Sequence, residues 1–238
     1  MRVSQIVRHQ IHINTQAVRS NVELRAIVAQ QCRDFRDSLI ESGQAPAHFR
    51  TMVDRQNDRA EESVKLDGGH VVYAFSGLAE AVPWCLTELR NRSPARSGNF
   101  RNSWFMMVDG RIWTDAPQAI PPGSEVWITN TAPYARKIEV GGQKTGVPPR
   151  IVESVRQSAR RRFQTVDFAR TFKALSGGSD SRGGPVPYIL KGSGIASGLS
   201  WSRKGGWTRK HNAYVSQRPD RQAGGQVLYP TLILTEKV

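Results

Sequence analysis

The chain has 238 residues, enough for one large domain with a real core or for one domain with long appendages. Only 38% of the residues are hydrophobic, which is low for a globular protein, so part of the chain is expected to be extended and packed against a partner. The formal net charge is +14, and residues 150–238 carry sixteen Lys and Arg against five Asp and Glu. Such a basic last third favours a polyanionic partner, usually nucleic acid, or equally a solvated or salt-bridged surface in an oligomer.

The cysteines and the hydropathy pattern exclude two classes of protein. Cys32 and Cys85 are too few for a disulfide framework, and both lie in apolar helical patterns, so we expect buried thiols in a reducing compartment. The N-terminus lacks the apolar stretch of a signal peptide, and no run approaches the roughly twenty apolar residues of a membrane span. The sequence therefore predicts a soluble protein that is made inside a cell and has no membrane partner.

The first predicted element is an amphipathic helix from Asn21 to Ser42. Its apolar residues recur every three or four positions, at Leu24, Val28, Cys32, Phe35 and Leu39. Ser42-Gly43, followed by Pro46, should end it. Two short strands are expected next, at Phe49–Val53 and Val71–Phe75, joined by an exposed charged connection over Asp54–Glu62.

A second helix and a β-hairpin are predicted in the middle of the chain. The helix has apolar residues at Leu78, Val82, Cys85 and Leu89, a kink at Pro83, and an end at Asn91. The hairpin has strands at Ser103–Val108 and Arg111–Thr114 around Asp109-Gly110, which is the strongest short hairpin signal.

The next predicted elements are two strand segments and a basic helix. Glu125–Asn130 should be a strand that Pro133 interrupts and Tyr134–Val140 resumes. A helix should begin after Pro148-Pro149, because proline is favoured at a helix start. Its apolar stripe consists of Val152, Val155, Ala159, Phe163 and Val166.

The character of the sequence changes at Ser176. Residues 177–225 contain eleven glycines among Ser, Arg, Lys and aromatic residues, and Val227–Leu234 returns to a strand pattern. The predicted fold class is α+β, with amphipathic helices packed on a mainly antiparallel β-sheet and a long Gly-rich basic extension. We expect a core domain over residues 1–175 with an N-terminal helix, a Gly/Arg/Trp-rich arm or insertion over 176–226, and a C-terminal strand over 227–238 that returns to the core sheet.

Two short blocks carry the clearest pattern in the chain. The first runs from Ser93 to Trp104 (SPARSGNFRNSW), and the second runs from Val126 to Glu139 (VWITNTAPYARKIE). Together with the basic helix after them, they resemble the neck or tail-completion proteins of long-tailed bacteriophages, the head–tail morphogenesis and minor tail family. The resemblance implies that this basic helix covers Arg150–Phe172. The resemblance covers roughly residues 70–172. Residues 177–226 have no counterpart in the family pattern.

The resemblance implies a structural virion protein without catalysis, in the neck or upper tail of a phage particle made in the bacterial cytoplasm. Such a protein forms a homo-oligomeric ring that completes the tail and helps to join it to the head. The implied partners are copies of itself, head-closure or connector proteins, tail tube or terminator proteins, and packaged DNA through non-specific backbone contact. Two alternatives are a tail-terminator ring and a free basic DNA-binding protein outside the virion.

The candidate site residues fall into two groups. Candidates for contact with DNA in the lumen, or with an acidic partner, are the cations of the basic helix and of the Trp-rich stretch: Arg156, Arg160, Arg161, Arg162, Arg203, Lys204, Arg209 and Lys210. A solvated helix face, or an arm that docks on a neighbour, explains them equally. Candidates for a subunit interface are Arg96, Arg101, Arg136, Glu139, Trp201 and Trp207. Ordinary ion pairs at strand ends are the simpler explanation for the four charged ones.

Catalysis is not expected. The five histidines are scattered, and no metal-ligand spacing, nucleophile motif or phosphate-binding loop is present in the sequence. Gly141-Gly142-Gln143-Lys144-Thr145-Gly146 contains Lys-Thr but lacks the spacing of a phosphate-binding loop. We therefore predict no catalytic residues, no metal and no cofactor.

Overall fold

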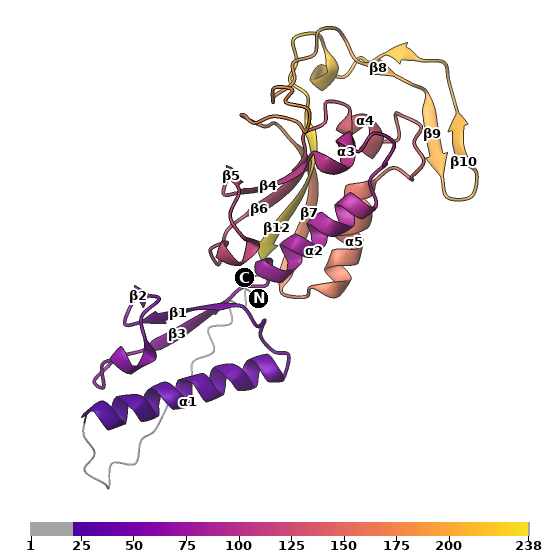
Figure 1. Cartoon of the computed structure of the whole chain (residues 1–238). Helices are drawn as coiled ribbons and strands as arrows, with labels where there is room; N and C mark the ends of the chain where they lie inside the picture. The colour runs from indigo at the N-terminus through magenta and orange to yellow at the C-terminus, as the bar shows by residue number, and fades with distance from the viewer. Residues whose placement is uncertain (1–20, 238) are drawn as a thin grey trace.

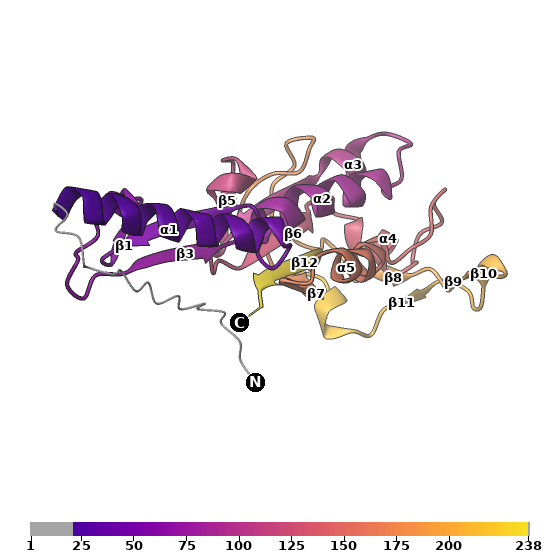
Figure 2. The same cartoon turned by 90° about the horizontal axis from the view of Figure 1, so that it is seen from below.

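The computed structural model describes residues 21–237 and has the α+β class expected from the sequence. Three parts can be followed in Figure 1: an N-terminal unit (residues 21–76), a central unit (77–175 and 227–237) and an extension (176–226). The N-terminal unit and the extension lie at opposite ends of the molecule, with the central unit between them (Figures 1 and 2). The central unit therefore separates the two outer parts.

The N-terminal unit is one helix on a three-stranded antiparallel sheet. Its elements are α1 (Asn21–Glu41), β1 (Phe49–Val53), β2 (Gln56–Asn57), the 3₁₀ turn η1 (Glu61–Ser63) and β3 (Val71–Phe75), with strand order β2-β1-β3. The expected helix and both expected strands are confirmed. Gly43 follows α1 with a φ of +70°, the left-handed conformation that ends helices.

The connection between β1 and β3 is exposed over residues 55–60, as the sequence predicted, but not at Glu61. Glu61 in η1 is only 9% exposed. Its carboxylate accepts hydrogen bonds from Arg33 of α1 at 3.2 Å and from the Tyr73 hydroxyl at 3.2 Å, and Arg36 lies 3.6 Å away. Burial, with the nearby Glu61 charge, raises the pKa of Tyr73. The connection therefore fixes α1 to the sheet by paired charges, which a count of charged residues cannot show.

The central unit is a five-stranded antiparallel sheet with helices on one face (Figure 1). Its elements are α2 (Leu78–Asn91), α3 (Asn99–Asn102), β4 (Trp104–Val108), β5 (Arg111–Trp113), η2 (Pro117–Ala119), β6 (Val126–Asn130), α4 (Ala135–Glu139), α5 (Ile151–Arg162), β7 (Val166–Lys173) and β12 (Tyr229–Glu236). The strand order is β5-β4-β6-β12-β7. The last strand, β12, thus returns from the extension to lie between β6 and β7.

The core lies between the sheet and helices α2 and α5. Leu78, Val82, Cys85 and Leu89 of α2, the predicted stripe, are all fully buried. Each large aliphatic side chain buried in this way contributes about 2 kcal/mol of hydrophobic stabilisation. A smaller apolar cluster covers part of the opposite sheet face, where the extension leaves and rejoins the sheet; its buried members are Met107, Leu175, Val186, Val227 and Tyr229.

The predicted hairpin is confirmed, because β4 and β5 pair across Asp109-Gly110. Both turn residues have positive φ, +49° for Asp109 and +79° for Gly110. Two positive φ angles in a two-residue turn match the right-handed twist of the flanking strands, and aspartate and glycine adopt them at low cost. The predicted helix through Pro83 is confirmed as well.

Two predicted elements are wrong. Tyr134–Val140 is not a strand but contains helix α4, with Ala135, Ile138 and Glu139 buried at helical spacing. The basic helix stops at Arg162 rather than Phe172, so Val166 belongs to strand β7 and not to the helical stripe. Buried Val166 and Phe168 alternate with exposed Asp167 and Ala169, a period of two that indicates a strand.

The extension contains two small antiparallel sheets. Its elements are β8 (Ile195–Ala196), β9 (Leu199–Ser202), β10 (Gly206–Arg209), β11 (Tyr214–Val215) and the 3₁₀ turn η3 (Pro219–Arg221), with β8 paired to β11 and β9 paired to β10. At Gly198, φ is +66° and a Cβ would lie 1.9 Å from the carbonyl oxygen of His211. Glycine is required at this position, because the two backbones cross too closely for any side chain.

Candidate functional site

The two sequence blocks come together in space and are joined by buried hydrogen bonds. The indole Nε1 of Trp104 donates to Ser93 Oγ at 2.8 Å, within the first block. Between the blocks, the side-chain amide of Asn130 donates to the carbonyl oxygen of Phe100 at 2.7 Å, and that of Asn99 donates to the Tyr134 hydroxyl at 2.8 Å. Ser93, Asn99, Trp104 and Asn130 are all at most 5% exposed. The polar residues of the blocks are therefore used to hold the fold.

Glu139, at the end of the second block, belongs to α4 but caps the N-terminus of helix α5. Its Oε2 accepts the backbone N–H of Val152 at 3.1 Å, and its own carbonyl accepts the N–H of Arg150 at 2.9 Å. The residue is 1% exposed, and burial raises the pKa of its carboxyl to about 7, although the α5 amides and Arg170, whose Nε is 3.6 Å away, oppose that rise. In this chain Glu139 is an internal helix cap, with no exposed surface to offer a neighbour.

Arg136, one turn earlier on α4, connects the second block to the extension. Its guanidinium lies 2.7 Å from Asp220 of η3 and 4.6 Å from the ring centre of Phe172. Only 13% of the side chain is exposed, and burial lowers its pKa. Arg136 is therefore occupied within the chain as well, where it fixes the root of the extension to α4.

The Asp220→Ala variant is expected to loosen the extension, because it leaves the buried Arg136 charge without its carboxylate. The expected loss is about 2 kcal/mol of unfolding free energy, with faster proteolytic cleavage within residues 191–225. The matched control is Arg218→Ala. Arg218 binds the same carboxylate but is 61% exposed, so the change should stay within about 0.5 kcal/mol. Equal cleavage rates for the two variants would contradict the role of the Arg136–Asp220 pair.

The other two charged interface candidates lie in α3 and in the turn before it. Arg96 is exposed in the turn before α3, and Arg101 is half-buried on α3 itself, with its Nε inaccessible to solvent. The four charged candidates therefore differ in accessibility, since Arg136 and Glu139 are occupied within the chain. Arg96 is the most accessible of them for contact with another molecule.

The four arginines of α5 do not form one free positive strip. Arg156 donates two hydrogen bonds to Glu153, at 2.9 and 2.7 Å, and this pairing lowers the pKa of Glu153 to about 2. Arg162 lies over the rings of Trp84 and Phe163, 5.6 and 5.5 Å from their centres. Arg160 and Arg161 are exposed. Arg160 and Arg161 therefore remain as accessible cations at the C-terminal end of α5, next to Arg162 with its two rings. All three also complement the helix dipole.

The cations of the Trp-rich stretch lie on the β9–β10 hairpin, which projects from the end of the molecule (Figures 1 and 2). Arg203 and Lys204 form its tip and are exposed, as are Arg209 and Lys210 at its base. Trp201 and Trp207 are directly opposite each other in the ladder and are half-buried. The Trp207 ring passes 3.8 Å from the position that a Cβ on Gly141 would occupy, so the aromatic face of the hairpin packs toward the loop after α4.

A groove of about 330 Å³ lies between α4 and the extension. Its cationic lining residues are Arg136, Lys137, Lys210, Arg218 and Arg221, with Asp220 as an acid that is already paired. Apolar side chains, including the exposed Val140, Ile195 and Tyr214, form much of the remainder. The groove therefore continues the basic surface of the hairpin toward the body of the protein.

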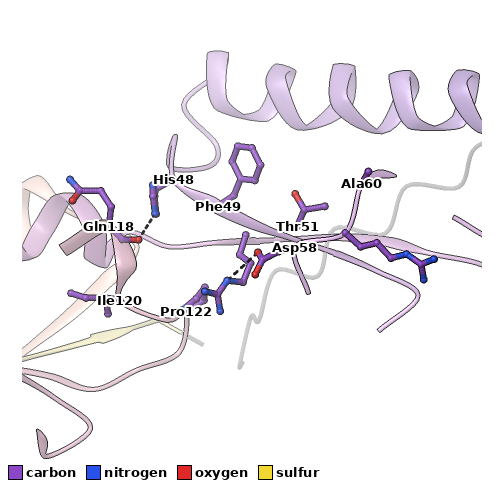
Figure 3. A pocket seen from close by; sticks show the side chains of 10 residues that line it. His48, Phe49, Thr51, Asp58, Ala60, Gln118, Ile120 and Pro122 are labelled. Atoms are coloured by element: carbon purple, nitrogen blue, oxygen red, sulfur yellow. Dashed lines mark hydrogen bonds and ion pairs between the residues drawn. The ribbon is translucent and has the colours of Figure 1, made fainter. Parts of the chain in front are cut away.

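A second pocket, of about 500 Å³, lies between the N-terminal unit and the turn η2 (Figure 3). His48 bonds through Nε2 to the carbonyl oxygen of Gln118 at 2.8 Å, and Asp58 lies 3.6 Å from Arg50. Arg59, which also lines the pocket, donates to the side-chain oxygen of Gln56 at 2.6 Å, and the lining contains no serine or cysteine. Within residues 21–237, no group of three His, Cys, Asp or Glu side chains could hold a metal ion. The pocket is lined by residues of both units.

Several residues of the site could not be identified from the sequence as functional. Asn99 and Asn130 were visible only as turn-forming residues inside the blocks, although an asparagine beside buried strand residues is a signal for a bonded core amide. Asp220 gave no signal, because it is separated from Arg136 by 84 positions in the chain.

No family model, no curated protein and no solved structure matches this chain. Within the part of the chain that the structure describes, no helix is both long and apolar enough to cross a bilayer.

Proposed function

We propose that this chain is a structural virion protein of a long-tailed phage, a ring subunit at the neck or upper tail that completes the tail and helps join it to the head. One observation carries the proposal: the residues of the two blocks that resemble the neck and tail-completion family bind one another in the interior. Asn130 with Phe100 and Asn99 with Tyr134 link the blocks directly. Such a framework supports a role in assembly, without catalysis.

The arrangement of the three parts supports a ring subunit. A cyclic ring needs two different surfaces on each copy, one for each neighbour. The N-terminal unit and the extension lie at opposite ends of the central unit (Figure 1). They differ in fold, and their sequences differ in net charge. In the proposed ring, residues 176–226 act as a Gly-rich basic arm that reaches a neighbouring copy or the lumen, and Trp201 and Trp207 anchor this arm on its own subunit.

The proposed partners follow from the exposed charges. Arg203, Lys204, Arg209 and Lys210 on the hairpin and Arg160 and Arg161 on α5 are accessible cations, which suit backbone phosphates of packaged DNA or acidic side chains of a head-closure or tail protein. Arg96 remains the accessible candidate for a contact between copies.

A phage from which this chain has been deleted tests the proposal. Filled heads and finished but unattached tails are expected, and the wild-type chain supplied from a plasmid should restore joined particles. Antibody labelling of intact particles should mark the region between head and tail. Tails of uncontrolled length would instead identify a tail-terminator ring, and normal particles without the chain would overturn a virion role.

Binding to DNA separates the proposed virion protein from a free DNA-binding protein. If the hairpin contacts phosphates, replacing all four of its cations with serine should weaken DNA binding and reduce the dependence of that binding on salt. If the purified chain binds DNA tightly while particles lacking it still assemble, the DNA-binding alternative replaces the proposed function.

A further inference from the structure

The central sheet ends in an open edge strand, β7. It pairs with β12 through all eight of its residues, Val166–Lys173, and is the last strand in the order β5-β4-β6-β12-β7. Within the described residues, its backbone forms no hydrogen bond outside that ladder. A long edge strand with unpaired N–H and C=O groups is a template on which another strand can add.

The sequence of β7 is complementary to itself when read in the opposite direction. Its last seven residues are Asp167-Phe168-Ala169-Arg170-Thr171-Phe172-Lys173. Around Arg170, an acid at one end matches a base at the other, a phenylalanine matches a phenylalanine, and the small Ala169 matches Thr171. Such a pattern suits an antiparallel pairing of two identical strands, because that pairing places residues equidistant from the centre opposite each other.

We propose that a second copy of this chain pairs with the free edge of β7, antiparallel and two-fold symmetric, with Arg170 opposite Arg170. Asp167 of each copy then faces Lys173 of the other, and Phe168 faces Phe172. The two central sheets join into one continuous sheet of ten strands. The contact has the self-complementary form of a two-fold interface.

In the joined sheet, the Asp167–Lys173 pairs and the Phe168–Phe172 pairs lie on opposite faces. Val166 and Phe168 belong to the core on the helix side, and Arg170 points to Glu139 on that same side. Because side chains alternate along a strand, Asp167, Ala169, Thr171 and Lys173 lie on the opposite face. The ion pairs therefore form on one face and the phenylalanine pairs on the other.

The charges on β7 are available for this pairing. Asp167 is exposed and makes no ion pair within the described residues. Lys173 lies over the ring of Trp127, with Nζ 4.3 Å from its centre, and makes no ion pair among the described residues, so it can turn to a carboxylate. The two central arginines would repel each other, but each has Glu139 at 3.6 Å and lies over Phe172 at 5.5 Å. Those local partners offset the like charges at the centre of the interface.

The pairing does not rest on the proposed virion function. It is a property of the purified chain, it covers the open edge before any assembly, and it leaves the N-terminal unit and the hairpin free. A failure of the pairing would not affect the proposed ring, which uses those other surfaces.

Charge reversal tests the pairing. Asp167→Lys places lysine opposite lysine twice in each dimer, so sedimentation equilibrium of the full chain should show association weakened about tenfold or more. Asp167→Lys combined with Lys173→Asp recreates both ion pairs in reverse and should restore association. Asp115→Lys makes the same change of net charge at an exposed position outside β7 and should associate like wild type. Far-UV circular dichroism and the melting temperature confirm that each variant is folded.

A cross-link tests the register. Ala169 of one copy faces Thr171 of the other, so a mixture of Ala169→Cys and Thr171→Cys chains should form a disulfide dimer under oxidation, whereas each variant alone should form much less. A wild-type chain that stays monomeric at every concentration overturns the proposal. So does a folded double charge variant that associates no better than Asp167→Lys, or cross-linking that is no stronger in the mixture.

Discussion

The Asn130→Ala variant is expected to unfold with about 3 kcal/mol less free energy than the wild-type chain. Asn130 is fully buried, and its side chain both donates to the carbonyl oxygen of Phe100 and accepts the N–H of Ala132 at 3.1 Å. Alanine leaves the N–H of Ala132 without a partner in a site that excludes water, and it leaves the carbonyl of Phe100 with only the weaker bond from the N–H of Ser103 at 3.3 Å. Urea denaturation followed by tryptophan fluorescence measures the difference.

The control for this variant is Asn212→Ala. Asn212 is exposed in the segment between β10 and β11, so its substitution should change the free energy of unfolding by less than about 0.5 kcal/mol. If Asn130→Ala were as stable as Asn212→Ala, the buried bonds between the two blocks would not be what holds them together. The structural interpretation of the blocks would then fail.

Stability is expected to depend on pH through Glu139. Its pKa is about 7 in the folded chain against an ordinary value of 4.5, so the unfolded chain loses this proton first as the pH rises. The contribution of Glu139 to stability is therefore complete below pH 4.5 and declines between pH 4.5 and 7. From the size of the shift, the decline is about 3 kcal/mol.

The Glu139→Gln variant isolates this effect. Glutamine can still accept the N–H of Val152 but does not ionise, so the stability difference between variant and wild type should shift by about 3 kcal/mol in favour of the variant across that range. Denaturation of both proteins at a series of pH values measures this difference. Glu153→Gln is the control: the pKa of Glu153 is lowered to about 2, so its contribution is lost only as the pH falls from 4.5 toward 2. A constant difference for Glu139→Gln would show that the carboxylate is not destabilised.

The sequence predicted best those elements that local residues determine. The stripe of α2 and the turn at Asp109-Gly110 depend on neighbours within a few positions, and both formed as expected. β7 was mistaken for helix because Val166 continues the spacing of α5, although Val166–Lys173 also alternates. Tyr134–Val140 was mistaken for strand because its aromatic and β-branched residues outweighed the helical spacing of Ala135, Ile138 and Glu139.

The candidate site was less predictable because its contacts are distant in sequence. The cations of the hairpin were recognisable as a group and are exposed. The buried positions of Arg136 and Glu139 could not be predicted, since their partners come from other elements: Asp220, Val152 and Arg170. Charge in a sequence shows how many ionic groups exist, whereas burial decides which of them remain free to meet another molecule.

The return of the chain to β12 has a mechanical consequence for the extension. The extension leaves from the end of β7 and re-enters at the start of β12, where Lys173 and Tyr229 are opposite each other. A force on the hairpin tip therefore pulls β7 and β12 in the same direction. The resistance comes from the β12–β6 ladder over Thr231–Leu234, which is loaded in shear with several hydrogen bonds sharing the force at once. A single cut in the extension would leave both of its halves anchored in the same sheet.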